Sequence, residues 1–303
     1  MEKTLIQPRA EGTLRLSDGR KLGYAEFGQG TGLPLFWFHG TPGARRQIAP
    51  ETRQLARKKG VRIICVERPG VGDSTPHRYN QIVDFASDIE QLADGLSIER
   101  FGVAGLSGGG PYALACAAHM PERVVVAAIL GGVAPSSGDE AAQGGPTTGL
   151  RRFGGLAGPL HKPMGKLLSG AVYALTPLAE PCIRVFSRFM PPGDQRVFSD
   201  PLVREMFVDD LVLGSRGNMQ ALFLDIRLFA RKWGFRLAEL KVPVYLIYGD
   251  EDTIVPVEHG HHLASCIPDA VLRVREKTGH LGGLEASSEI IDVLLNAWSK
   301  VAV

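Results

Sequence analysis

The stretch from Val103 to Gly110 (VAGLSGGG) constrains the fold of this chain more than any other. Its apolar residues predict a buried strand that ends at Ser107, which has Gly105 and Gly109 two positions before and after it. A strand that turns at once into a helix strains its middle residue, and flanking side chains would collide with neighbouring backbone. Residues 111–119 have a helical composition. We therefore expect Ser107 to stand at a sheet edge beside the start of a helix, where negative charge is stabilised.

This strand-turn-helix arrangement is the setting of the Gly-x-Ser-x-Gly nucleophile motif. Glycine-rich turns of the same kind also bind phosphate groups or simply allow close packing. A dinucleotide site would need Gly-x-Gly-x-x-Gly in the first strand-helix turn, and a phosphate loop would need Gly-Lys followed by Ser or Thr. The first turn lacks the former sequence and the whole chain lacks the latter. The nucleophile motif is therefore favoured, and the remaining sequence has to support it.

Strands and helices alternate through the first part of the chain. An Asp-Gly turn at Asp18 predicts an antiparallel hairpin of residues 13–16 and 22–27. Continuous apolar runs predict strands buried on both faces, at residues 33–38, 61–66, 101–106 and 124–130. Helical patterns lie between them, at residues 46–59, 82–96 and 111–119. This order predicts an α/β fold, with a mostly parallel twisted sheet and helices on both faces.

The alternation stops at Gly131 and resumes at Val242. Residues 135–241 give helical patterns broken by Gly and Pro, without a convincing strand, and predict a helical cap over the sheet. The α/β core then comprises residues 1–134 and 242–303. Its second part contains the remaining predicted elements: strands at 242–248 and 270–274, and helices at 258–266 and about 287–301.

The charges are nearly balanced, with 34 basic and 32 acidic residues and a net charge of +2. This balance gives no reason to expect nucleic acid or an anionic membrane as a partner. Residues 1–12 are polar, and no apolar run is long enough to span a membrane. The four cysteines lie far apart in apolar segments, which favours buried free thiols in a reducing compartment. We therefore expect a cytoplasmic protein without an integral membrane segment.

A serine hydroxyl becomes a strong nucleophile only when a base removes its proton, and a third group must hold that base in the correct tautomer. Asp252 follows the predicted strand at 242–248, so it should emerge at the same sheet edge as Ser107. His280 follows the last predicted strand, and the glycines on both sides of it allow a close approach. Asp250 and Asp225 are alternatives to Asp252 for the acidic role.

These motifs resemble those of the α/β-hydrolase superfamily, and within it the cap-bearing serine esterases and proline-iminopeptidase-like hydrolases. The resemblance rests on Ser107, Asp252, His280 and the His39-Gly40 loop, in the same chain order. It implies an oxyanion hole formed by the backbone N–H groups of Gly108 and Thr41, and a structural role for His39. It requires no cofactor and no metal. Three histidines lie in the predicted helix at 258–266: His259, His261 and His262. They could suggest a metal site, but a solvated helix face explains them better.

The resulting expectation is a serine hydrolase that opens an ester, or a similarly activated carbonyl, of a largely apolar small molecule. Apolar residues of the cap should pack it on the core, and some should line the pocket: Phe186, Phe189, Met190, Met206, Phe207, Phe223 and Phe229. One alternative is a proline aminopeptidase, with Glu205, Asp209 and Asp210 holding the free amine. Thr41 counts against it, since that family has glycine there in a His-Gly-Gly-Pro-Gly loop. The other alternative is a ligand receptor of the same fold that binds without turnover.

Overall fold

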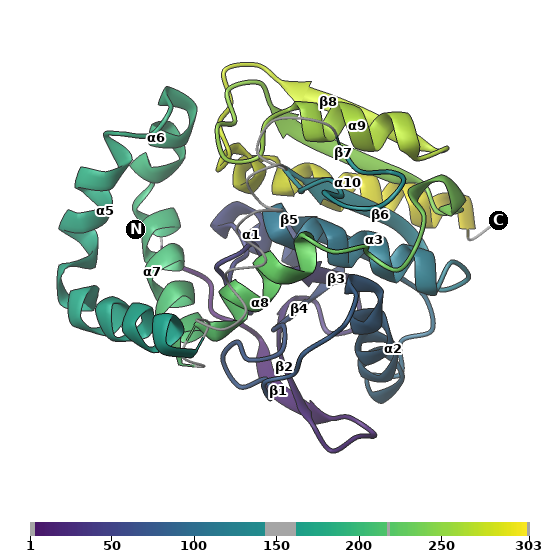
Figure 1. The fold of residues 1–303 in the computed structure, drawn as a ribbon, viewed down its shortest axis with the longest axis horizontal. Helices are drawn as coiled ribbons and strands as arrows, with labels where there is room; N and C mark the ends of the chain where they lie inside the picture. Colours follow the sequence, from purple (N-terminus) through teal and green to yellow (C-terminus); the bar gives the residue numbers. More distant parts are fainter. Residues whose placement is uncertain (1–3, 143–161, 217–218, 302–303) are drawn as a thin grey trace.

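The computed structural model describes residues 4–142, 162–216 and 219–301. One eight-stranded sheet forms the centre of the molecule, in the order β1-β2-β4-β3-β5-β6-β7-β8 (Figure 1). Strand β2 is antiparallel to β1 and β4, and all the other neighbouring pairs are parallel, which confirms the predicted fold class. The strands are β1 Ala10–Arg15, β2 Lys21–Gly28, β3 Leu33–Phe38, β4 Val61–Val66, β5 Phe101–Leu106, β6 Val124–Leu130, β7 Val244–Gly249 and β8 Ala270–Arg275.

Helices cover both faces of the sheet, and each face has its own apolar core. Alternate side chains of β3 enter the two cores, Leu35 and Trp37 on one side, Phe36 and Phe38 on the other. Helices α1 and α10 close the first core, whereas η1, α2, α3 and α9 close the second. Their bounds are α1 Pro50–Lys58, η1 Ile82–Phe85, α2 Ala86–Gly95, α3 Gly110–His119, α9 Glu258–Cys266 and α10 Gly282–Val301.

Two helices begin at residues other than those predicted. Helix α1 begins at Pro50 rather than Arg46, because a residue that precedes proline avoids the helical region, and Ala49 is extended. Helix α10 begins at Gly282, about five residues before the predicted start. A Cβ at Gly282 would overlap the Thr278 side chain, so glycine there allows the helix to begin directly against the preceding loop.

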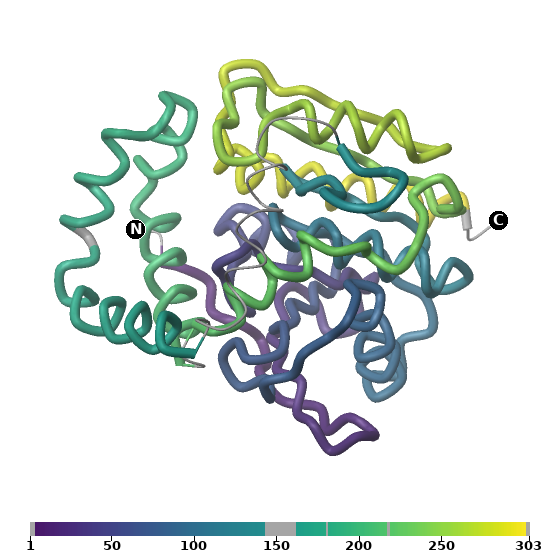
Figure 2. The backbone as a smooth tube through the Cα atoms, viewed as in Figure 1, coloured from purple at the N-terminus to yellow at the C-terminus, as the bar shows by residue number. Residues whose placement is uncertain are grey.

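The segment between β6 and β7, called the insertion below, contains no strand among its described residues. Residues 162–175 are helical, and the other elements are η3 Thr176–Leu178, α5 Ala179–Ser187, α6 Pro192–Ser199, α7 Pro201–Ser215, α8 Gln220–Phe229 and η4 Leu237–Glu239. In Figures 1 and 2 the teal helices α5, α6 and α7 stand at one side of the sheet, and α8 returns across it near α3. Residues 143–161 of the predicted cap lie outside the described residues, and the assignment of 135–241 as a cap domain stays a prediction.

The apolar residues expected to pack this insertion on the core behave differently from one another. Met206 and Phe229 are buried, as expected. Phe186 and Phe189 are 61% and 85% exposed, so the prediction that they pack against the core is wrong. Phe207 is half-buried and packs edge-to-face on Phe198, a contact within the insertion.

The cysteine prediction is correct only in part. Cys65 and Cys116 are buried free thiols, Cys266 is half-buried, and Cys182 on α5 is exposed. Successive residues of a helix point in different directions, so some residues of an apolar helical segment face the solvent. This explains the exposed thiol of Cys182. Across the described part of the chain, no helix combines the length and apolar character that membrane crossing requires.

Candidate active site

Ser107 lies in the tight turn that the sequence predicts. It has a positive φ of 52° and begins the turn η2 Ser107–Gly109, which leads directly into α3. A Cβ at Gly105 would overlap the Gly109 carbonyl, and a Cβ at Gly109 would overlap the carbonyl of Phe38. Both glycines are therefore required by close approach of backbone to backbone.

His280 connects Ser107 to Asp252. Its Nε2 lies 2.9 Å from the Ser107 hydroxyl, and its Nδ1 lies 2.7 Å from Asp252 Oδ2. The other oxygen of Asp252 accepts hydrogen bonds of 2.8 Å from the N–H groups of Ile254 and Val255, which fix the carboxylate. When Nδ1–H donates to Asp252, Nε2 is left to accept the serine proton.

The two alternative acids have other partners. Asp250 accepts a hydrogen bond from the Thr278 N–H at 3.2 Å. Asp225, on α8, accepts hydrogen bonds from the side chains of Thr41, Arg68 and Tyr112. The geometry therefore favours Asp252 for the acidic position.

Thr41 and Gly108, the two expected backbone donors, lie side by side. A Cβ at Gly108 would overlap the Thr41 hydroxyl. Gly108 belongs to the first turn of η2, whose leading N–H groups have no acceptor within the turn. Among the described residues, no group accepts a hydrogen bond from the Thr41 N–H. The two N–H groups are thus available on adjoining loops.

His39 is buried in the loop that carries Thr41. Its Nδ1 lies 2.8 Å from the Gly40 carbonyl, and its Nε2 accepts the Arg68 N–H at 3.4 Å. Complete burial lowers the pKa of His39 well below its ordinary value, so the ring is neutral. With both nitrogens bonded to backbone groups, His39 holds the loop together, in line with the expected structural role.

The histidines of α9 do not form one solvated face. His259 is buried and its Nδ1 accepts the Ala134 N–H at 2.9 Å, which corrects the expectation for this residue. The His262 Nε2 lies 2.8 Å from the Glu140 carbonyl. Within the described ranges no three His, Cys, Asp or Glu side chains are grouped as metal ligands.

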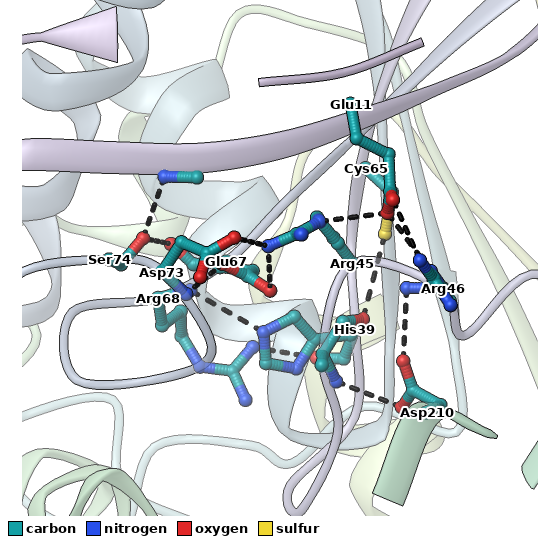
Figure 3. A network of polar contacts seen from close by, with 12 residues as sticks. Glu11, His39, Arg45, Arg46, Cys65, Glu67, Arg68, Asp73, Ser74 and Asp210 are labelled. Atoms are coloured by element: carbon teal, nitrogen blue, oxygen red, sulfur yellow. Dashed lines mark hydrogen bonds and ion pairs between the residues drawn. The ribbon is translucent and has the colours of Figure 1, made fainter. Parts of the chain in front are cut away.

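Buried aspartates on three helices of the insertion bond the loops around this site. On α6, Asp194 accepts the N–H groups of His280 and Leu281, at 3.2 and 2.8 Å. On α7, Asp210 accepts those of Ala44 and Arg46, each at 2.9 Å (Figure 3). Asp225 on α8 is the third. Sequence analysis missed Asp194, because nothing in the pattern around it indicates burial or a contact with the His280 loop.

We expect the stability of the protein to depend on pH through Asp210. Burial raises the pKa of this carboxyl to about 7, above its ordinary value of about 4. Between these values the folded state binds more protons than the unfolded state, so the free energy of unfolding falls as pH rises, by up to about 1.4 kcal/mol per pH unit. Melting curves of the parent and Asp210→Asn at pH 5 to 8 check this. The parent should lose stability relative to the variant as pH rises, and parallel profiles would contradict the assignment.

A mostly parallel sheet with a serine in the turn after a central strand defines a class of α/β hydrolytic enzymes. The sequence model of the alpha/beta hydrolase fold family matches residues 34–287. The chain belongs to this family, and its recognition from the sequence is confirmed.

Relatives in sequence include two kinds of hydrolase. A proline iminopeptidase from Arabidopsis thaliana is 34% identical over 122 residues, which are 39% of this chain and only 32% of that protein. A 2-hydroxy-6-oxononadienedioate/2-hydroxy-6-oxononatrienedioate hydrolase from Pseudomonas sp is 29% identical over 240 residues, 78% of this chain and 77% of that protein. Among solved structures, the enol-lactonase from Burkholderia xenovorans LB400 has a TM-score of 0.66 at 20% identity, over 95% of this chain and 100% of that one. This structural likeness concerns the fold alone.

Proposed function

We propose that the protein is a serine hydrolase that cleaves a carboxylic ester, or a similarly activated carbonyl, of a largely apolar small molecule. One observation carries the proposal: His280 lies 2.9 Å from the Ser107 hydroxyl and 2.7 Å from the Asp252 carboxylate. This is the order of nucleophile, base and orienting acid that acyl transfer requires.

In this mechanism Ser107 attacks the carbonyl carbon while His280 Nε2 takes the serine proton. Asp252 holds the imidazole and stabilises its protonated form. The N–H groups of Gly108 and Thr41 donate to the negatively charged oxygen of the tetrahedral intermediate. Collapse expels the alcohol, which takes the proton from His280 and leaves an acyl group on Ser107. His280 then removes a proton from water, whose oxygen attacks the acyl-enzyme. Collapse of this second tetrahedral intermediate breaks the bond to Ser107, which takes the proton back from His280 as the carboxylic acid leaves. No cofactor is needed for these steps.

The surroundings of the donors support an apolar substrate. Phe229, from α8, lies next to Gly108, since a Cβ there would be 3.1 Å from its ring. Phe229 also packs edge-to-face on Tyr112 of α3. The sequence relative named as a 2-hydroxy-6-oxononadienedioate/2-hydroxy-6-oxononatrienedioate hydrolase supports hydrolysis as the reaction class.

An aminopeptidase acting on proline is the second candidate, favoured by the relatives named proline iminopeptidase. The carboxylates expected to hold a free amine argue against it. Asp210 is buried against two backbone N–H groups, and Asp209 is paired with Arg46. Glu205, the third of these carboxylates, is exposed and forms no such bond with another described residue.

A substrate panel separates these functions. We expect continuous release of p-nitrophenol from esters of graded acyl length. We expect little hydrolysis of proline p-nitroanilide, because Asp209 and Asp210 are already bonded to groups of the protein. Faster cleavage of the anilide than of any ester would favour the aminopeptidase. Tight binding of an ester with a single turnover or none would favour a receptor of the same fold.

A further inference from the structure

A buried arginine lies behind the loop that carries Thr41. Arg68 follows β4, and its side chain is 2% exposed. Its Nη1 donates to the His39 carbonyl at 2.6 Å, and its Nη2 donates to the Gly40 carbonyl at 2.8 Å. Figure 3 shows the Arg68 side chain beside His39. Four of the five N–H donors of this guanidinium bind groups of the protein, so it acts on the loop rather than as a free site for a substrate anion.

These contacts determine which way a neighbouring N–H points. The Gly40 carbonyl and the Thr41 N–H belong to one trans peptide plane and point in opposite directions. The Gly40 carbonyl oxygen lies 2.8 Å from Arg68 Nη2 and also 2.8 Å from Nδ1 of the His39 ring, and these two contacts hold it. The Thr41 N–H is therefore directed away from Arg68. A rotation of this peptide would turn a carbonyl oxygen toward the position where the negative charge develops.

Asp225 anchors Arg68 from the insertion. Its carboxylate accepts the Arg68 Nε–H at 2.9 Å, the Thr41 hydroxyl at 2.8 Å and the Tyr112 hydroxyl at 2.8 Å. Arg68 Nη2 also donates to the Thr41 hydroxyl at 2.8 Å. The Asp225 carboxylate on α8 thus contacts both Thr41, which carries the N–H group, and Arg68, which holds the peptide between Gly40 and Thr41.

We propose that Asp225 and Arg68 are positioning residues that set the direction of the Thr41 N–H, so that α8 controls stabilisation of the tetrahedral intermediate. The inference rests on the proposed function. It gives the insertion a part in catalysis, beyond the walls of a pocket. Because the negative oxygen exists only after attack, a misdirected N–H lowers kcat and leaves substrate binding nearly unchanged.

Asp225→Asn tests this, since it keeps the shape of the side chain and removes its charge. On p-nitrophenyl acetate we expect kcat to fall about 10- to 100-fold with KM within about twofold, less than the loss of a whole donor. Affinity for an aryl trifluoromethyl ketone, which forms a charged tetrahedral adduct with serine, should fall by about the same factor as kcat/KM. Tyr112→Phe is the matched control, because it removes another hydrogen bond from the same carboxylate and keeps the aromatic ring that lies against Arg68. It should keep kcat and ketone affinity within about threefold.

Arg68→Lys provides the second measurement and covers the case in which Asp225→Asn does not fold. Lysine keeps the charge beside Asp225 but cannot bridge the carbonyls of His39 and Gly40, so the same fall in kcat is expected. Unchanged kcat and ketone affinity in a folded Asp225→Asn or Arg68→Lys variant would overturn the inference and leave the proposed function intact. A parent protein that neither hydrolyses esters nor forms the ketone adduct would refute the proposed function, and the inference with it.

Discussion

Ser107→Ala will lose ester turnover by about a thousandfold or more while its melting temperature stays close to that of the parent. Removal of the hydroxyl eliminates the acyl-enzyme pathway, and only the fixed N–H donors and substrate binding remain. The fold should tolerate the change, because Ser107 is half-buried and its replacement leaves no core cavity. Initial rates on p-nitrophenyl acetate and a melting curve check both parts.

Ser97→Ala is the matched control for that variant. Ser97 is exposed and has a positive φ of 54°, close to the 52° of Ser107. It therefore reproduces the same substitution at a similar positive φ, before the start of β5, whereas the proposed nucleophile follows the end of that strand. A fluorophosphonate should label the parent and the Ser97 variant but not Ser107→Ala. Equal turnover by Ser107→Ala and the parent would remove the serine from the mechanism.

Asp252→Asn will lower kcat by about three to four orders of magnitude. An amide at this position can donate to Nδ1 of His280 and stabilise the tautomer that presents a hydrogen to Ser107 instead of a lone pair. The backbone N–H groups of Ile254 and Val255 can still bond the amide oxygen, so the loop should keep its position. Steady-state rates and melting temperature, measured together, separate this effect from unfolding.

Asp250→Asn is the comparison, because Asp250 lies two residues earlier and bonds only the Thr278 N–H among the contacts described above. Its kcat should stay within about threefold of the parent value. The opposite order of effects would assign the orienting role to Asp250.

The sheet could be predicted because buried strands are apolar on both faces. The bounds of β3, β4 and β5 agree with the apolar runs at 33–38, 61–66 and 101–106. The approach of His280 and Asp252 to Ser107 followed from a topological fact: loops that leave parallel strands emerge at one edge of the sheet.

Burial of charged residues was much harder to predict. Arg68 is not among the site residues predicted from the sequence, but it bonds the carbonyls of His39 and Gly40 in the neighbouring loop. Asp210 was a candidate for binding a substrate amine only in the aminopeptidase alternative, but its carboxylate accepts two backbone N–H groups. A charged residue has the same letter in the sequence whether it is solvated or buried, and only contacts distant in the chain distinguish the two.

The contact between α6 and the His280 loop restricts how substrates can reach the serine. Asp194 supplies the acceptor for the N–H groups of His280 and Leu281, so a rigid outward swing of α6 would leave both amides unsatisfied and release the base. We therefore expect substrate entry and product exit to proceed while α6 stays in place. The same requirement applies to chimaeras in which the insertion comes from another protein. Such an insertion would keep the proposed alignment of His280 only if it supplied a hydrogen-bond acceptor in the position of Asp194, whatever pocket it formed elsewhere.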